Sequence, residues 1–199
     1  MASRPTSASV SSVTLTTDVA SAEARARALL GAGSARWQHV AGVASAAAAA
    51  AEGMSDWEAG LLVAAAWLHD IGYAAEVADT GFHPLDGARY LRSSGAPDRL
   101  CCLVANHTNA RTESEARGLV TALAEEFPAE DSLVADALTF ADLTTGPTGS
   151  PVSVEARLRE ILERYEPGHV VHESIRQEAP DLIATIRRVE ARLATAHPR

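Results

Sequence analysis

The chain has 199 residues, of which 47% are hydrophobic and 22% charged, and its formal net charge is −9. This length can bury one sizeable core and is short for two ordinary domains, so we expect a single domain. The excess of acidic residues disfavours a nucleic-acid polymer or an anionic membrane as the main partner, because both require clustered positive charge.

Residues 1–17 are rich in serine and threonine and lack the continuous apolar segment of a signal peptide. We expect a disordered N-terminal segment there and one helical domain, including the C-terminal helices, over residues 18–199. The longest apolar run, Leu61–Leu68, is much shorter than the roughly 20 residues of a membrane-spanning helix. The two cysteines are adjacent, which argues against a disulfide framework. These features favour a cytoplasmic protein.

Helical periodicity and capping residues predict an all-α fold. Ser34 caps a helix that runs through an alanine tract, and Ser55 with Glu58 forms a capping-box pattern that opens the next helix. His83 and Pro84 resemble a cap and a first helical position. The predicted helices span residues 18–30, 34–53, 55–72, 83–94, 97–107, 115–127, 130–143, 154–165 and 170–179, with a last one starting at Pro180.

Histidine and aspartate side chains recur on the apolar faces of four predicted helices. His39, His69, His107 and Asp142 each lie three or four residues from an apolar position, namely Val43, Ala65, Val104 and Leu138. Buried imidazole and carboxylate groups are costly unless something compensates them, and a metal ion does so best. The pattern therefore indicates a buried metal site.

The order His, His-Asp, His, His, Asp occurs in the strings RWQHVAGVA, WLHDIGY, FHPLDGARYL, NHT and ADLTT. Over about residues 34–145 this pattern resembles the HD-domain phosphohydrolases, and the resemblance implies an HD-domain helical bundle. It also implies catalysis at the His69-Asp70 pair and two divalent metal ions, with iron or manganese favoured and zinc, cobalt or nickel as alternatives. The implied ligands are His39, His69, Asp70 and Asp142 for one ion, and His83 and His107 for a second, with Asp70 bridging.

Such a pair of ions activates a water for attack on a phosphoryl group, so the expected activity is hydrolysis of a small phosphorylated metabolite or nucleotide. Arg36 lies three residues before His39 on nearly the same helical face and is the best candidate to bind the substrate phosphate. Thr108, Asn109 and Thr145 are further candidates to line the pocket. Two other arginines, Arg89 and Arg157, are weaker candidates.

Two other functions fit the same residues. A di-iron oxygenase of the HD superfamily would use a similar ligand set, although all 17 basic residues are arginines and the lysine with which inositol-type oxygenases hold their substrate is missing. A non-catalytic sensor of nucleotides or metals is the third possibility. The helices beyond Asp142 either complete the pocket or form a homodimer interface. His169 and His172 are predicted to lie on the surface.

Overall fold

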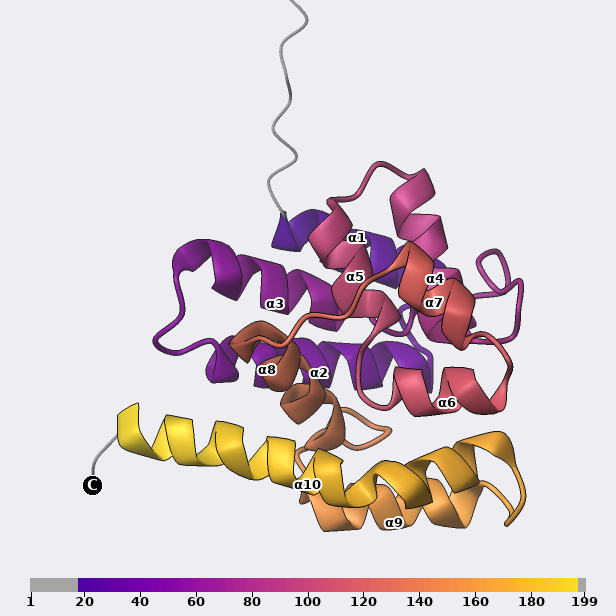
Figure 1. The fold of residues 1–199 in the computed structure, drawn as a ribbon. Coiled ribbons are helices and arrows are strands. Elements are labelled where there is room, and N and C mark those ends of the chain that lie inside the picture. Colours follow the sequence, from indigo (N-terminus) through magenta and orange to yellow (C-terminus); the bar gives the residue numbers. More distant parts are fainter. Residues whose placement is uncertain (1–17, 197–199) are drawn as a thin grey trace, which may run out of the picture.

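The computed structural model describes residues 18–196, which form helices and connecting loops with no β-sheet among them (Figure 1). The predicted all-α class is confirmed. The elements are α1 (Val19–Leu30), α2 (Ala35–Ala50), α3 (Asp56–Leu68), the 3-10 turn η1 (Ile71–Tyr73), α4 (His83–Ser93), α5 (Asp98–Ala105), α6 (Ala110–Ala116), α7 (Val120–Glu126), α8 (Leu133–Leu143), α9 (Val154–Arg164) and α10 (Val170–Ala196).

Helix α3 is the centre of the main core and packs against α1, α2, α5 and α8. The predicted capping box opens it, with the Ser55 hydroxyl accepting from the Glu58 N–H and the Glu58 carboxylate accepting from the Ser55 N–H. Alanines of α2 and α3 are buried where the two helices meet, among them Ala47 and Ala65. Small side chains let the helix backbones approach closely, which brings the end of α3 near the start of α2.

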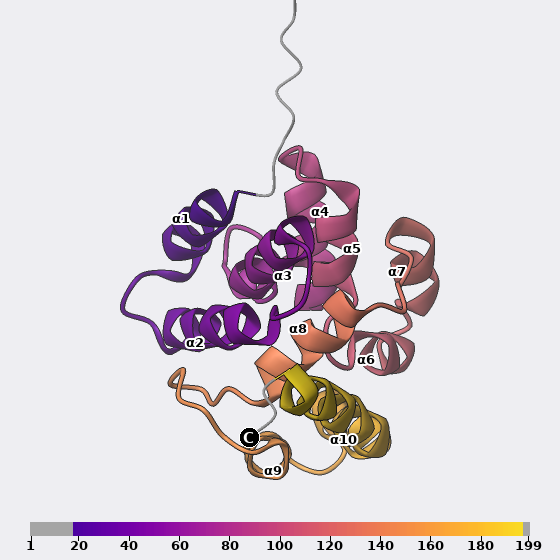
Figure 2. The same cartoon turned by 90° about the vertical axis from the view of Figure 1, so that its left-hand side faces the viewer.

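Helices α9 and α10 form a second layer, drawn along the bottom of both views (Figures 1 and 2). Helix α10 packs against α6, α8 and α9. A smaller apolar cluster holds this layer together and includes Leu143 at the end of α8, Leu158 and Ile161 on α9, and Ile175 and Ile186 on α10. The C-terminal helices therefore close over the side of the bundle on which α8 ends.

The prediction of one continuous helix over residues 115–127 is wrong, because the chain forms two helices there, α6 and α7, with a break between them. Gly118 has a φ of 72°. The Leu119 N–H donates to the Ser114 carbonyl and the Gly118 N–H to the Glu115 carbonyl. These two hydrogen bonds form a Schellman motif, in which glycine readily adopts the left-handed conformation that ends a helix.

The predicted start of a last helix at Pro180 is also wrong, because α10 continues through this residue. Proline removes one backbone hydrogen bond and crowds the preceding turn. Burial of Ile175 before it and of Leu182 and Ile186 after it holds both halves on the same core. Tertiary packing thus outweighs the local preference.

No helix within residues 18–196 has the length and apolarity needed to cross a bilayer. The predicted disordered segment, residues 1–17, lies outside the part of the chain that the structure describes.

Candidate metal centre

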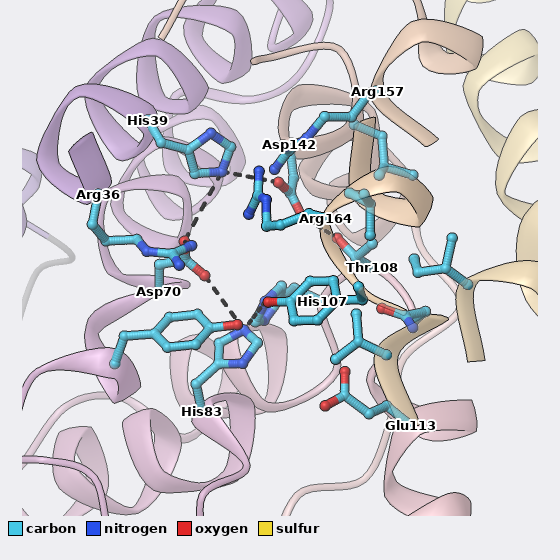
Figure 3. Close-up of a pocket in the computed structure, with 17 residues that line it drawn as sticks. Arg36, His39, Asp70, His83, His107, Thr108, Glu113, Asp142, Arg157 and Arg164 are labelled. Atoms are coloured by element: carbon cyan, nitrogen blue, oxygen red, sulfur yellow. Dashed lines mark hydrogen bonds and ion pairs between the residues drawn. The ribbon is translucent and has the colours of Figure 1, made fainter. Parts of the chain in front are cut away.

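Four imidazoles and two carboxylates meet in the interior, and all of them except His69 are drawn in Figure 3. His39 comes from α2, His69 and Asp70 from the two residues between α3 and η1, His83 from the start of α4, His107 from the residues just after α5, and Asp142 from the end of α8. Every one of the six predicted ligands therefore reaches the same site. All are buried except His83, which is partly buried.

The six side chains form two groups that share Asp70. His39 Nε2 lies 3.1 Å from Asp142 Oδ1 and 4.0 Å from Asp70 Oδ2, and His69 Nε2 lies 3.6 Å from Asp70 Oδ1. On the other side, His83 Nε2 is 3.3 Å from Asp70 Oδ1. The ligand atoms of His39, His69 and Asp70, and those of Asp70, His83 and His107, each lie within 4.8 Å of one another.

Backbone carbonyls fix the tautomer of three imidazoles. The Nδ1 atom of His69 lies 2.8 Å from the Ala66 carbonyl oxygen, that of His107 lies 2.6 Å from the Val104 oxygen, and that of His39 lies 3.1 Å from the oxygen of residue 146. A carbonyl oxygen only accepts hydrogen bonds, so each Nδ1 carries the proton. The Nε2 atoms of His69 and His107 therefore present lone pairs to the centre of the site, the arrangement found in metal-binding histidines, while His39 Nε2 faces Asp142 Oδ1.

Two buried imidazole nitrogens face the centre of the site without a proton of their own. His69 Nε2 is fully buried and has no hydrogen-bond partner in the structure. His83 Nε2 lies 3.2 Å from His107 Nε2, and the His107 nitrogen carries no proton in the tautomer that its backbone contact sets. A buried polar atom without a partner is costly. Divalent metal ions with mixed imidazole and carboxylate ligands would give His69 Nε2 the partner it lacks and would accept the lone pair of His107 Nε2, so the donor set fits the expected group.

The charge states also suit a cation. Burial alone would raise the pKa of Asp70, but at the low pH where this carboxyl titrates, the protonated His69, the Arg36 guanidinium and His83 hold the pKa well below its usual range. Burial lowers the pKa values of His69, His83 and His107 and favours their neutral forms, whereas at His39 the lowering by burial is outweighed by the Asp142 carboxylate, which raises the pKa. Ionised carboxylates and neutral imidazoles are the forms that bind metals.

Two features of the loop region before α4 place His83 beside Asp70. Gly72, in the turn after Asp70, touches the His83 backbone so closely that an added Cβ would lie 2.0 Å from the His83 carbonyl oxygen. The buried Asp86 carboxylate accepts hydrogen bonds from the backbone N–H groups of residues 79–81 and from the Thr80 hydroxyl. The prediction that His83 is the cap is wrong: His83 is the first residue of α4, and Phe82 occupies the cap position.

The loop over residues 144–151 supports His39 from the opposite side. A bridge between Thr145 and Pro151 closes the loop, which packs on α2. Gly149 has a φ of 78°, and a Cβ there would lie 2.3 Å from a carbonyl oxygen of α2. The same loop supplies the carbonyl oxygen of Gly146 that accepts from His39 Nδ1. Small residues at this contact therefore set the orientation of the His39 ring.

Thr108 holds Asp142 from an uncommon backbone conformation. Its φ is 53°, in the left-handed region that β-branched residues avoid. The Thr108 hydroxyl donates to Asp142 Oδ2, while Asp142 Oδ1 faces His39. Strained residues held by their surroundings often occur at functional sites. Thr108 directly follows His107, so this one strained residue positions both the His107 backbone and, through its hydroxyl, the Asp142 carboxylate.

The cavity at the centre is lined by predicted and unpredicted residues alike. Arg36, Thr108 and Asn109 line it, whereas the Thr145 hydroxyl donates to the Ala141 carbonyl and Thr145 does not face the cavity. Arg89 lies elsewhere and pairs with Glu126. Eight further residues line the cavity that were not predicted from the sequence, namely Tyr73, Glu113, Leu143, Ile161, Arg164, Tyr165, Val171 and Ile175, and Arg157, expected only as a weak candidate, lines it too.

A spacing signal could have found the two arginines of α9. Arg157 and Arg164 are seven residues apart, which is two helical turns, so they share a face. Both reach toward His39 and Asp142 (Figure 3). His169 and His172 lie on the segment that opens α10 and do not line the cavity; His169 is exposed and His172 is half-buried, with its Nδ1 2.8 Å from the Tyr165 carbonyl oxygen.

An all-helical domain with this buried cluster of histidines and aspartates defines a candidate metalloprotein. Comparison with protein families identifies the particular class: the model of the HD domain matches residues 36–168. The chain belongs to the HD domain family. Searches of curated proteins and of solved structures found no significant match.

Proposed function

We propose that this protein is a metal-dependent phosphohydrolase that acts on a small phosphorylated metabolite or nucleotide. The observation that carries the proposal is one cavity in which a two-part set of metal ligands faces three guanidinium groups, those of Arg36, Arg157 and Arg164. Arginine binds phosphoryl oxygens well because its planar donors match their geometry. The family and the ligand types support this reaction.

The ligands would hold two divalent ions, with Asp70 shared between the two groups. When bound, such ions supply an activated water and positive charge at the phosphoryl oxygens. We favour iron or manganese, and zinc, cobalt or nickel would also accept these ligands.

The chain's own residues bind and orient the substrate. Arg36 Nη1 donates to Asp70 Oδ2 at 2.6 Å, and its guanidinium stacks 3.9 Å from the centre of the Tyr73 ring. These contacts fix Arg36 beside the ligands with donors left for phosphoryl oxygens. Leu143, Ile161 and Ile175 form an apolar wall that limits water at the site and can contact the organic part of a substrate.

The test is phosphate release by purified protein loaded with Mn²⁺ or, under anaerobic conditions, with Fe²⁺. A panel of nucleotides and sugar phosphates is assayed for the wild type, Asp70→Ala and the control Asp181→Ala, which changes an exposed carboxylate on α10. We expect turnover to fall at least about a hundredfold in Asp70→Ala, because loss of groups that merely orient ligands already costs about 10- to 100-fold. Asp181→Ala should keep the wild-type rate.

Two outcomes would contradict the proposal and identify its rivals. Oxygen uptake by the Fe²⁺ protein without phosphate release from any ester would favour the oxygenase. Tight nucleotide binding without turnover of either kind would favour the sensor.

A further inference from the structure

A second cavity, of about 330 Å³, opens directly beside the metal centre. It is lined by Arg36, His39, Pro147, Arg157, Glu160 and Arg164, and four of these residues also line the cavity at the metal ligands. The space at the metal ligands is only about 70 Å³. Sites for whole metabolites have volumes of roughly 300 Å³ or more, so most of a substrate must extend into neighbouring space.

The charge of this second cavity is unusual for so acidic a chain. Three arginines face one carboxylate, although the whole protein carries a net charge of −9. Glu160 lies between the two arginines of α9, accepting from Arg157 Nη1 at 2.6 Å and from Arg164 Nε at 2.9 Å. Arg157 donates to Oε2 and Arg164 to Oε1 of this carboxylate, so donors of both guanidiniums point at one anionic group.

The buried Nε of Arg157 is independent evidence that this cavity lacks a hydrogen-bond acceptor. Its side chain is only 7% exposed, and its Nε is buried without a hydrogen-bond acceptor in the structure. A buried guanidinium donor without an acceptor is costly, because it has lost its water and gained nothing in return. An anion with several oxygens, bound in the second cavity, would supply the acceptor that Glu160 does not provide.

We propose that the second cavity binds a second phosphoryl group of the substrate, so that the protein cleaves a phosphoanhydride rather than a simple phosphate monoester. This inference rests on the proposed function. The attacked phosphoryl group lies at the metal ligands, and the leaving phosphate lies among Arg36, Arg157 and Arg164. The water oxygen forms a bond to phosphorus, the bridging P–O bond breaks, and its electron pair leaves with the departing phosphate. The protons of the water pass to the phosphate products or to solvent.

The arginines have a clear role in that reaction. Negative charge grows on the bridging oxygen and the leaving phosphate as the P–O bond breaks. Donors that already point at this position stabilise the transition state without having to reorganise. A leaving alcohol would bring no second charge to the cavity and would gain little from it.

The decisive measurement is calorimetric binding of two non-hydrolysable probes, methylenediphosphonate and methylphosphonate, to the Mn²⁺-loaded protein. The variants are Arg164→Gln, Arg157→Gln and the control Arg159→Gln, which removes an exposed arginine from the same helix. Wild type and Arg159→Gln should bind the diphosphonate at least about tenfold more tightly than the monophosphonate. Losing one charged hydrogen-bond donor should reduce this preference by roughly 10- to 100-fold in Arg164→Gln.

Binding requires no turnover, so this test can fail while the proposed hydrolysis stands, and the reverse also holds. Equal affinity of the wild type for the two probes would overturn the inference. So would a preference that Arg164→Gln leaves intact. Arg157→Gln is included because it removes the buried guanidinium, and Arg164→Gln decides the matter if the buried substitution prevents folding. A kinetic check is the ratio of kcat/KM for a nucleoside diphosphate to that for p-nitrophenyl phosphate, which should fall in Arg164→Gln.

Discussion

Replacing Gly72 by alanine should remove one metal ion and leave the other. The added Cβ would lie 2.0 Å from the carbonyl oxygen and 2.8 Å from the Cα of His83. Both are backbone atoms, so no side-chain rotation relieves the clash. Ordinary contact requires the two segments to separate by roughly 1 to 1.5 Å.

A displacement of that size matters because metal ligands tolerate only about 0.2 Å of error. His83 Nε2 lies 3.3 Å from Asp70 Oδ1 and 3.2 Å from His107 Nε2, and it would move out of this group. The other group, around His39 and His69, does not depend on this contact. Overpacking of this kind also destabilises a protein by about 1–3 kcal/mol.

The assay combines elemental analysis with thermal unfolding, and Gly33→Ala is the control because an added Cβ there meets no atom within 4 Å. We expect Gly72→Ala to retain about one metal equivalent and to unfold about 3–10 °C below the wild type. Gly33→Ala should match the wild type in both respects. Two equivalents in Gly72→Ala, with an unchanged midpoint, would refute the role assigned to this close contact.

Three further perturbations test other parts of the site. Asp86→Ala removes the acceptor for the N–H groups of the loop before α4, and it should lower the free energy of unfolding, measured with denaturant, by about 2 kcal/mol or more. The same variant should lose the second metal ion in elemental analysis. Gly149→Ala forces the loop off α2 and should weaken metal binding at His39, measured by titration with a chelator. The metal-free protein should lose stability as the pH falls below about 4, because the lowered pKa values of Asp70 and Asp142 contribute stability that is present above their unfolded-state pKa and lost as the carboxylates protonate. Thermal midpoints between about pH 6 and 2 should show this, and Asp142→Asn should flatten the curve.

Much of the fold and of the ligand set could be predicted, because both depend on local patterns. Caps at Ser34 and Ser55 and apolar periodicity locate α2 and α3. The same periodicity places His39 and His69 on the apolar faces of their helices, so their burial could be predicted from the sequence alone.

The unpredicted parts depend on contacts between segments far apart in the chain. Whether α10 passes through Pro180 is decided by burial on both sides of the residue. The orientation of Arg164 into the cavity depends on how α9 packs against α8 and α10. Thr145 was expected to line the pocket, but its hydroxyl donates to the backbone of α8 instead. A single sequence contains no direct signal for such packing.

The central claim is that Asp70 joins two groups of metal ligands in one buried centre. Its most direct test is elemental analysis of protein purified without oxygen, comparing the wild type with His83→Ala and Asp70→Ala. The wild type should carry about two equivalents of metal, His83→Ala about one and Asp70→Ala almost none, because only Asp70 belongs to both groups. A wild type without bound metal, or an Asp70→Ala variant that keeps the wild-type content, would contradict the claim.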